Sequence, residues 1–253
     1  MEINFNKQKV LITGSSKGIG FYIAKKFINL GAIVSINSRN KNNLNLAKNR
    51  ISSPSLHTLK YDLSNKNNFK KILKSADKIM GGLDILICNL GYSKANSAIG
   101  EEKYEDWIKS LSYNLISSTQ LIVESKKYFK KSKNPNVVCI GSIAGSMSIN
   151  APISYSSSKA ALIHFVKNQS KILSKSNIRI NMVSPGNVFF PGGNWDKKLK
   201  KNPIKIKKYI NQNVPLNRFA NPEEIADAVI FLASNKSMFT TGSNLVIDGG
   251  QSA

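Results

Sequence analysis

The sequence has little of what metal centres and disulfide frameworks require. Cys88 and Cys139 are its two cysteines, and His57 and His164 are its two histidines. Both cysteines lie in short apolar runs typical of buried strands, so we expect core thiols and no disulfide. The histidines are far apart in the sequence, and no cluster of cysteines, histidines or carboxylates accompanies them, so no metal site is expected.

Long apolar runs and a cleavable leader are also missing. No apolar stretch reaches the roughly 18 to 20 residues that a membrane helix needs. Residues 1–9 carry charge and run directly into a strand-like segment, without the apolar core of a signal peptide. We therefore expect a cytoplasmic protein without a membrane partner.

Negative charge is scarce, because 14 Asp and Glu residues face 37 Lys and Arg residues, for a formal net charge of +23. Such an excess could serve nucleic acid, an anionic membrane surface or an acidic partner. Nearly all of it is lysine, and asparagine is abundant as well, a combination that A/T-rich codons would produce. No basic stretch is interleaved with the aromatic residues that single-strand binding uses. A codon bias is therefore favoured over a polyanion site, and nucleic acid ranks last among the candidate partners.

Short apolar runs alternate with longer helical patterns along the whole chain. Strands are predicted at residues 10–13, 32–36, 56–61, 83–88, 137–140, 178–183 and 245–247. Helices are predicted at residues 19–30, 44–51, 64–80, 101–131, 154–174 and 222–233. This alternation predicts an α/β fold: a single doubly wound Rossmann-type domain over residues 1–253, with a parallel seven-stranded sheet and helices on both faces.

One irregular stretch interrupts the alternation. Residues 185–215 are rich in Lys, Gly and Pro, and a loop this long within one domain is usually functional. We interpret residues from about 187 to 215 as a substrate lid. Its aromatic residues Phe189, Phe190 and Trp195 could wall an apolar part of a substrate pocket or only pack the lid onto the body.

A glycine-rich turn follows the first predicted strand and opens the first predicted helix. It reads Thr13-Gly14-Ser15-Ser16-Lys17-Gly18-Ile19-Gly20. Glycines there permit the tight turn and the close approach of a pyrophosphate, and the helix N-terminus offers unpaired N–H groups. The turn therefore predicts a dinucleotide site that includes Gly14, Ser16, Lys17, Gly18, Ile19 and Gly20.

The end of the second predicted strand distinguishes the two nicotinamide cofactors. An NAD site usually has a carboxylate there, but the sequence reads Ile36-Asn37-Ser38-Arg39. Arg39 can hold a 2′-phosphate in a fork of N–H donors, and Lys17 could add a second positive charge. NADP(H) is therefore the predicted cofactor, with Ser38 and Arg39 in its site.

Tyr155 and Lys159 are spaced i, i+4 on a predicted helix, so both side chains lie on one face. A lysine ammonium stabilises a phenolate and lowers the pKa of the phenol, which suits a tyrosine to proton transfer. Ser142 follows the predicted strand 137–140, at the edge where the loops of a parallel sheet converge on a ligand. The three residues together predict a proton-transfer site.

Taken together, these motifs resemble the classical short-chain dehydrogenase/reductase family over essentially the whole chain. The family's Thr-Gly-x-x-x-Gly-x-Gly motif matches residues 13–20, and its Asn-Asn-Ala-Gly motif is kept at Asn89 and Gly91. The tail, residues 218–250, is similar to the 3-oxoacyl-(acyl-carrier-protein) reductase branch. The cofactor-binding residues that the resemblance adds are Asp62, Leu63, Asn89, Gly91, Tyr155, Lys159, Pro185, Gly186 and Val188. The catalytic residues that it implies are Asn114, Ser142, Tyr155 and Lys159.

The resemblance also implies a role for each catalytic residue. Tyr155 protonates the forming alkoxide as NADPH delivers a hydride to the carbonyl carbon, and Ser142 hydrogen-bonds the carbonyl oxygen. Lys159 binds the nicotinamide ribose and lowers the pKa of the tyrosine, while Asn114 holds a water that links Lys159 to solvent. The family usually has a threonine where this sequence has Phe190, which puts the expected nicotinamide contact there in doubt.

The predicted function is an NADP-dependent oxidoreductase that interconverts a ketone and a secondary alcohol. Its first candidate substrates are 3-oxoacyl thioesters, because of the tail. Lys130, Lys131, Lys171 and Lys175 could then contact an acidic acyl carrier protein. A sugar or polyol dehydrogenase is the alternative, because the Phe-Pro-Gly-Gly sequence of the lid is atypical. A non-catalytic NADP-binding protein is a remote alternative, because fold alone does not fix function.

The resemblance further implies a homo-oligomer, either a tetramer or a dimer. Members of the family commonly pair through the long helices and the C-terminal strand region. The predicted helices at residues 101–131 and 154–174 are the candidates for that interface.

Overall fold

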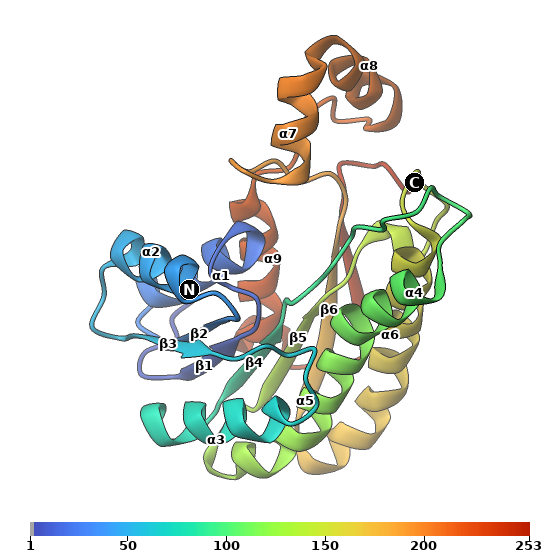
Figure 1. Cartoon of the computed structure of the whole chain (residues 1–253). Helices are drawn as coiled ribbons and strands as arrows, with labels where there is room; N and C mark the ends of the chain where they lie inside the picture. The colour runs from blue at the N-terminus through green and yellow to red at the C-terminus, as the bar shows by residue number, and fades with distance from the viewer. Residues whose placement is uncertain (1–2) are drawn as a thin grey trace.

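The computed structural model describes residues 3–253 and contains one sheet of seven parallel strands (Figure 1). Their order across the sheet is β3-β2-β1-β4-β5-β6-β7. The strands are β1 (Lys9–Ile12), β2 (Ile33–Ser38), β3 (Leu56–Lys60), β4 (Ile85–Cys88), β5 (Asn136–Ile140), β6 (Arg179–Pro185) and β7 (Asn244–Ile247). The predicted parallel seven-stranded α/β fold is confirmed, with each strand close to its predicted bounds.

Helices make the connections between these parallel strands. The α-helices are α1 (Gly18–Asn29), α2 (Lys41–Ile51), α3 (Asn68–Met80), α4 (Tyr104–Leu111), α5 (Ser117–Ser125), α6 (Ile153–Leu173), α7 (Asn194–Lys201), α8 (Pro203–Asn213) and α9 (Pro222–Ala233). The shorter turns are the π-helix η1 (Ser112–Ile116) and the 3-10 helices η2 (Lys126–Lys131), η3 (Ile143–Gly145), η4 (Ser174–Ser176) and η5 (Asn235–Ser237). Within residues 3–253, none of the helices has both the length and the apolar character of a membrane span.

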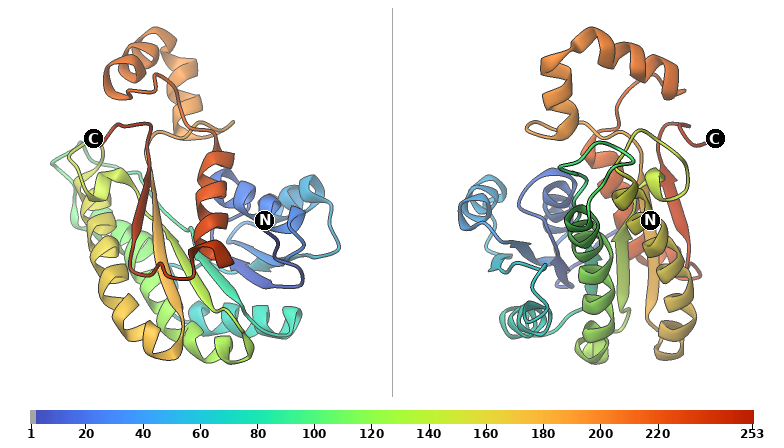
Figure 2. Two further views of the ribbon diagram at one scale, coloured as in Figure 1. Left: turned by 180° about the vertical axis from the view of Figure 1, so that it is seen from behind. Right: turned by 45° about the vertical axis from the view of Figure 1, so that its right-hand side comes forward.

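Helices cover both faces of the sheet, as Figures 1 and 2 show. Val10 and Ile12 of β1 pack into a core cluster with residues of α1 and α9, whereas Leu11 packs into a second cluster with residues of α3, α5 and α6. Successive side chains of a strand point to opposite faces, so each face of β1 has an apolar layer to bury against. This is why the strand is continuously apolar instead of alternating between apolar and polar residues.

Cys88 and Cys139 lie opposite each other in register on the neighbouring strands β4 and β5. Both thiols are buried and free. The contact with Cys139, followed by desolvation, raises the pKa of Cys88 well above its usual value. The expectation of buried core thiols is confirmed for both residues.

The helix predicted over residues 101–131 is less regular than its pattern indicates. It begins at Tyr104, contains the π-helical turn η1 and ends in the 3-10 turn η2. In η1 the carbonyl of Tyr113 accepts a hydrogen bond from Ser117 Oγ at 2.8 Å, and the Asn114 side chain binds the backbone of Tyr92. These side-chain hydrogen bonds accompany the wider π-helical turn. The spacing of apolar residues in the sequence does not reveal them, so the irregularity could not be predicted from that pattern.

The lid predicted as an irregular stretch contains two short helices, α7 and α8, which stand over the upper edge of the sheet in Figure 1. Asn202 separates them and caps α8, because its Oδ1 accepts a hydrogen bond from the backbone N–H of Lys205 at 3.0 Å. Trp195 of α7 stacks on Tyr209 of α8 with ring centres 5.3 Å apart. The segment is therefore helical, with its own aromatic contact between the two helices.

The strand β1 lies between β2 and β4, so the chain leaves it first toward one side of the sheet and later toward the other. In open parallel sheets, ligands bind outside the carboxyl ends of the strands at such a switch point. The turns that follow β1 to β5 all begin at this edge. The fold thus gathers the predicted site segments on one side of the molecule.

Candidate active site

The glycine-rich turn between β1 and α1 leaves no room for larger residues. Gly14 has φ +59°, and a Cβ there would lie 2.9 Å from the Cα of Leu90. A Cβ on Gly20 would collide with the amide of Asn89. Glycine is therefore required at Gly14 by its left-handed conformation and at both positions by the close approach of the turn that follows β4.

Asn89 fastens this turn to the end of β4. Its Nδ2 donates to the carbonyls of Thr13 and Gly14, both at 2.9 Å. The backbone N–H groups of Asn89 and Leu90 both donate to Thr13 Oγ1 at 3.0 Å. The side chain of Asn89 is thus occupied by the protein, and its place in the predicted cofactor site is to hold the turn in shape.

Asn37 at the end of β2 supports the same turn and is absent from the predicted site. Its buried amide donates to the carbonyls of Leu59 and Tyr61 at 3.1 and 3.0 Å, and its Oδ1 accepts from the N–H of Gly14 at 3.4 Å. A polar residue inside an apolar strand was the signal that could have identified it.

The N-terminus of α1 has the charge distribution of an anion site. Its first turn contains no acidic residue, and Lys17 occupies the N-cap position without a capping side-chain bond. A cation at this end opposes the helix dipole, and the first N–H groups of a helix have no partner within it. A phosphate would both balance this positive charge and accept hydrogen bonds from the unpaired N–H groups. The turn therefore fits the pyrophosphate of a dinucleotide. Of the other predicted contacts, Ser16 is buried and Ile19 packs against the core.

Arg39 reaches over the edge of the sheet toward two other segments. Its Nη1 donates to the hydroxyl of Tyr113 at 2.6 Å and lies 3.8 Å from a carboxylate oxygen of Asp62. The ring of Tyr113 lies in turn 5.8 Å from that of Tyr92. The structure therefore brings Arg39 and Asp62 together, while Lys17 stays at α1. Tyr113 was not predicted, and an aromatic residue directly before Asn114 was its one signal.

Ser38 and Leu63, also in the predicted cofactor site, have structural partners. The Oγ of Ser38 accepts from the N–H of Asn40 at 3.2 Å, just before α2. Leu63 is buried in the second core cluster beside α3. Ser38 is the last residue of β2 and Leu63 lies in the turn after β3, so both are at the same edge as Arg39.

Three of the four predicted catalytic residues meet just beyond the carboxyl end of β5. Lys159 is only 3% exposed, and its Nζ donates to the carbonyl of Ile140 at 2.8 Å. The same Nζ lies 5.9 Å from the centre of the Tyr155 ring. The hydroxyl of Ser142 is close enough to the Tyr155 phenol to lower its pKa, and its Oγ accepts from the N–H of Ala144 at 3.2 Å. A hydroxyl, a phenol and a buried ammonium are thus adjacent.

Asn114, the fourth residue, faces this group across Gly91. Its Oδ1 accepts from the N–H of Tyr92 at 2.7 Å, and its Nδ2 donates to the Tyr92 carbonyl and to Ser110 Oγ, both at 2.9 Å. A Cβ on Gly91 would lie 3.4 Å from Asn114 Oδ1 and 3.7 Å from Lys159 Nζ. The missing side chain of Gly91 leaves a gap, about one methyl group in size, that borders both polar atoms.

Burial moves the pKa values of the two proton-carrying groups in opposite directions. It lowers the pKa of Lys159 to about 8, because desolvation penalises the ammonium. It raises the pKa of the half-buried Tyr155, against a smaller lowering by the hydrogen bond from Ser142. The sequence predicted that Lys159 would lower the pKa of the tyrosine. In the structure desolvation raises the pKa of Tyr155, and the Lys159 ammonium donates to the Ile140 carbonyl.

The turn after β6 is packed against the end of β7. A Cβ on Gly186 would lie 2.8 Å from the Cβ of Asp248, and the N–H of Gly186 donates to the carbonyl of Ile247 at 2.9 Å. Pro185 ends β6, and Val188 is buried and bridges to Ala220. These predicted cofactor contacts lie at the carboxyl end of β6, on the same edge of the sheet as Tyr155.

The aromatic residues of the lid divide between the two roles left open by the sequence. Phe190 lies against Gly18, so it packs the start of the lid onto the glycine-rich turn. Phe189 packs on Phe219 with ring centres 5.9 Å apart. Trp195, in contrast, lines a cavity of about 470 Å³ beneath the lid.

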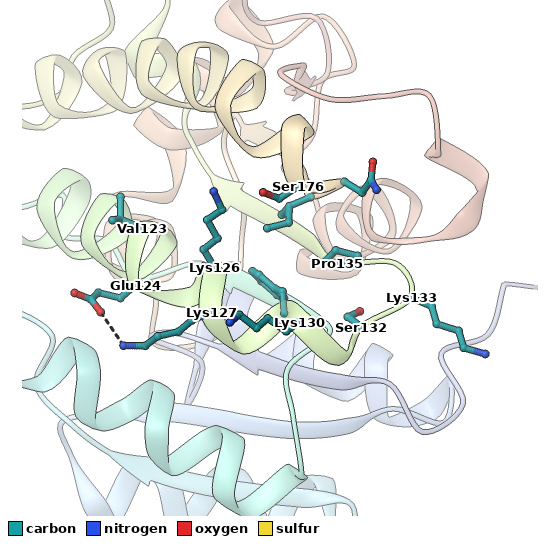
Figure 3. A pocket seen from close by; sticks show the side chains of 12 residues that line it. Val123, Glu124, Lys126, Lys127, Lys130, Ser132, Lys133, Pro135 and Ser176 are labelled. Carbon is teal, nitrogen blue, oxygen red and sulfur yellow. Dashed lines mark hydrogen bonds and ion pairs between the residues drawn. The ribbon is translucent and has the colours of Figure 1, made fainter.

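A second cavity, of about 600 Å³, lies away from all of these residues (Figure 3). Its lining includes Lys126, Lys127 and Lys130 of η2, just before β5, and residues 176–178, just before β6. It therefore lies at the amino edge of the sheet, opposite Tyr155. Lys130 consequently does not border the candidate site of its own chain.

Comparison with known proteins places the whole chain among reductases and dehydrogenases. A family model described as Enoyl-(Acyl carrier protein) reductase matches residues 14–252. The 3-oxoacyl-(acyl-carrier-protein) reductase of Buchnera aphidicola is 32% identical over 248 residues, which is 98% of each chain. The glucose 1-dehydrogenase of Gluconobacter oxydans is 30% identical over 252 residues, covering 97% of this chain and 92% of the relative.

A solved structure shares the fold at lower identity. The NADPH-bound short-chain oxidoreductase of Pseudomonas aeruginosa PAO1, which contains an atypical catalytic center, matches with a TM-score of 0.90. The identity is 23%, and 98% of each chain is covered.

Replacing Gly14 with alanine tests whether the tight turn is needed for nucleotide binding. The control is Gly81→Ala, because Gly81 also has a positive φ (+73°) but no atom lies within 4 Å of its added Cβ. We expect both variants to lose about 1 to 2 kcal/mol of unfolding free energy from the left-handed backbone. Urea unfolding and fluorescence titration with NADPH would show an additional stability loss and weakened binding for Gly14→Ala alone. Equal behaviour of the two variants would contradict the packing argument.

Proposed function

The chain belongs to the short-chain dehydrogenase/reductase family of oxidoreductases, and on this premise we propose that it transfers a hydride between NADPH and a ketone or its secondary alcohol. The observation that carries the proposal is the buried ammonium of Lys159 next to the phenol of Tyr155 and the hydroxyl of Ser142. A phenol beside a buried ammonium is suited to proton transfer to an oxygen atom.

NADPH supplies the hydride when it is bound. The turn at residues 13–20 would hold its pyrophosphate at the N-terminus of α1, where Lys17 adds positive charge. Arg39 would hold the 2′-phosphate, and the Tyr113 hydroxyl would keep the guanidinium in place beside the carboxylate of Asp62. No carboxylate follows β2 to bind a free ribose hydroxyl, and this favours NADPH over NADH.

The proton path starts at the substrate oxygen. Ser142 would donate a hydrogen bond to that oxygen, and Tyr155 would give up its phenol proton to the forming alkoxide. The charge of Lys159 stabilises the resulting phenolate. The gap at Gly91 separates Lys159 from the clamped side chain of Asn114, and a water molecule there would return a proton to the pair.

The proposed substrates are 3-oxoacyl thioesters. The support is the 32% identity with a 3-oxoacyl-(acyl-carrier-protein) reductase over nearly the full length of both chains. A sugar or polyol is the second candidate, supported by the 30% identity with a glucose 1-dehydrogenase. Turnover of one class and not the other separates the two candidates.

We also propose that the chain acts as a homo-oligomer, with an acyl carrier protein as a candidate donor of the substrate. Apolar side chains on α4, η1 and α5 support the oligomer, because Ile108, Ile116 and Val123 are 45%, 45% and 53% exposed. Exposed apolar residues gathered along one helical segment are typical of an interface between subunits.

The proton-donor role of Tyr155 is tested by following NADPH oxidation with acetoacetyl-N-acetylcysteamine. We expect Tyr155→Phe to lower kcat by roughly 10² to 10⁴, the usual contribution of a general acid. NADPH binding, measured by fluorescence, should change little, because the ring is kept. An active Tyr155→Phe enzyme would refute the assignment. If the wild type does not reduce thioesters but does reduce keto-sugars, the substrate is a sugar or polyol instead.

The choice of cofactor is tested by replacing Arg39 with alanine and comparing NADPH with NADH. Loss of a charge-assisted contact of about 1.5 to 3 kcal/mol should lower kcat/KM for NADPH by about 10- to 100-fold. The value for NADH should stay nearly constant. Arg50→Ala is the matched control, because Arg50 stacks on Phe21 in α1 and makes no contact with Asp62 or Tyr113 in the described structure. A wild type that prefers NADH would refute the proposal directly.

The pH profile of ketone reduction should follow the ammonium of Lys159. Since its pKa is lowered to about 8, the charge is present below that pH and is lost above it. We expect kcat/KM to be level below pH 8 and to fall about tenfold per pH unit above it. Lys159→Arg keeps the charge, so any residual activity should persist to higher pH. A level wild-type profile to pH 9.5 would contradict the role of this charge.

A further inference from the structure

The cavity beneath the lid has a positively charged rim and no acidic residue in its lining. Its volume is about 470 Å³, and its charged lining residues are Lys198 and Lys201 of α7 and Lys205 of α8. The rest of the lining is aromatic, aliphatic or amide in character, including the stacked pair Trp195 and Tyr209. The described residues around this space thus supply positive charge alone.

The single acidic residue of the lid is already engaged elsewhere. Residues 191–215 contain seven lysines and one aspartate, Asp196. The buried carboxylate of Asp196 accepts from the N–H of Gly192 at 2.8 Å and from Lys200 Nζ at 2.9 Å. It therefore neutralises Lys200, which does not line the cavity, and leaves the three lining lysines without that counter-charge.

The three lysines are placed at some electrostatic cost. Lys198 and Lys201 are three residues apart on α7, so like charges share one helix face. Lys205 lies in the first turn of α8, where a cation opposes the helix dipole. Lys198 Nζ also lies 4.5 Å from the centre of the Trp195 ring, which keeps its charge at the cavity. A general excess of lysine explains their number but not this convergence.

The cavity adjoins the segments that carry the reaction. Asn187 in its lining follows Gly186 at the end of β6, and Asn150 lies in the loop just before α6, five residues before Tyr155 in the first turn of that helix. A molecule with its carbonyl at Tyr155 would extend from there beneath α7 and α8, which Figure 2 shows above the sheet edge. The lysines would then meet the part of the substrate remote from the carbonyl.

We propose that this cavity binds an anionic group, a phosphate or a carboxylate, on the remote end of the carbonyl substrate. The inference rests on the proposed function and narrows it to charged substrates. Trp195 and Tyr209 contact the linker between the two ends, and the ammonium groups of Lys198, Lys201 and Lys205 pair with the anion. In a 3-oxoacyl thioester the phosphate of the phosphopantetheine arm is a group of this kind.

The test compares substrates that differ in one charge. Acetoacetyl-4′-phosphopantetheine and acetoacetyl-pantetheine form the phosphate pair, and 4-oxopentanoate and its methyl ester form the carboxylate pair. Three exposed ion pairs should give the wild type about a tenfold higher kcat/KM for the charged member. The pair that shows this preference identifies the anion. A wild type without a preference in either pair would overturn the proposal.

Variants assign the preference to these lysines. The triple variant Lys198→Gln, Lys201→Gln and Lys205→Gln should lose the preference while it reduces the uncharged member at the wild-type rate. The control is Lys197→Gln, Lys207→Gln and Lys208→Gln, which removes the same charge from the same two helices outside the cavity lining. If both triple variants lose the preference for the charged substrate equally, the preference comes from the general positive charge of the surface, and the proposed site is overturned.

Binding provides a readout that does not depend on turnover. In a Trp107→Phe background Trp195 is the only tryptophan, so its fluorescence reports ligands in the cavity. Tighter binding of 4′-phosphopantetheine than of pantetheine, or of 4-oxopentanoate than of its ester, supports the proposal when the lining variant abolishes the difference. Equal binding within both pairs overturns it. If no thioester or ketone is reduced but the charged ligand binds, the proposed activity fails and the anion site stands.

Discussion

Parallel strand pairing is the constraint on which the candidate site depends. Thr13, Arg39, Asp62, Asn89 and Ser142 follow five different strands, from β1 to β5 in that order. They meet because every strand of a parallel sheet ends on the same edge. An antiparallel arrangement would send alternate turns to opposite edges and separate the glycine-rich turn from Arg39. The helical crossovers that parallel pairing requires also bring α6, with Tyr155 and Lys159, to that edge.

The small number of carboxylates shapes the electrostatics of the whole molecule. Within residues 3–253, seven of them accept backbone N–H groups and fix turns or helix ends: Asp62 at Ser64, Asp84 at Lys9, Glu102 at Gly100 and Ile153, Asp106 at Asn96, Asp196 at Gly192, Glu224 at Asn221, and Asp248 at Gly250 and Ser252. Because carboxylates are far fewer than cations, ion pairs reach few of the lysines in residues 3–253. Positive potential therefore persists at the surface and beneath the lid, where an anionic ligand would be attracted.

The sequence predicted the parts of the molecule that depend on local pattern. Buried parallel strands are continuous apolar runs, and the spacing of Tyr155 and Lys159 fixed their common helix face. Contacts between distant segments could not be predicted in the same way. The turn η1 depends on Tyr92, which is 22 residues from Asn114, and the partner of Arg39 is 74 residues away. The pKa of Tyr155 likewise depends on tertiary burial, which no spacing reveals.

The central position of β1 has a consequence for the order in which the molecule can assemble during synthesis. Val10 pairs with Val34 on one side and with Ile85 on the other, so the first strand made is enclosed only after the fourth. By then the ribosome has already produced the glycine-rich turn, Arg39 and Asp62, and Asn89 follows immediately. Tyr155 and the turn at Gly186 are translated much later. A growing chain therefore contains β1 to β5, whose ends carry the glycine-rich turn, Arg39, Asp62, Asn89 and Ser142, before it contains the residue that would transfer the proton.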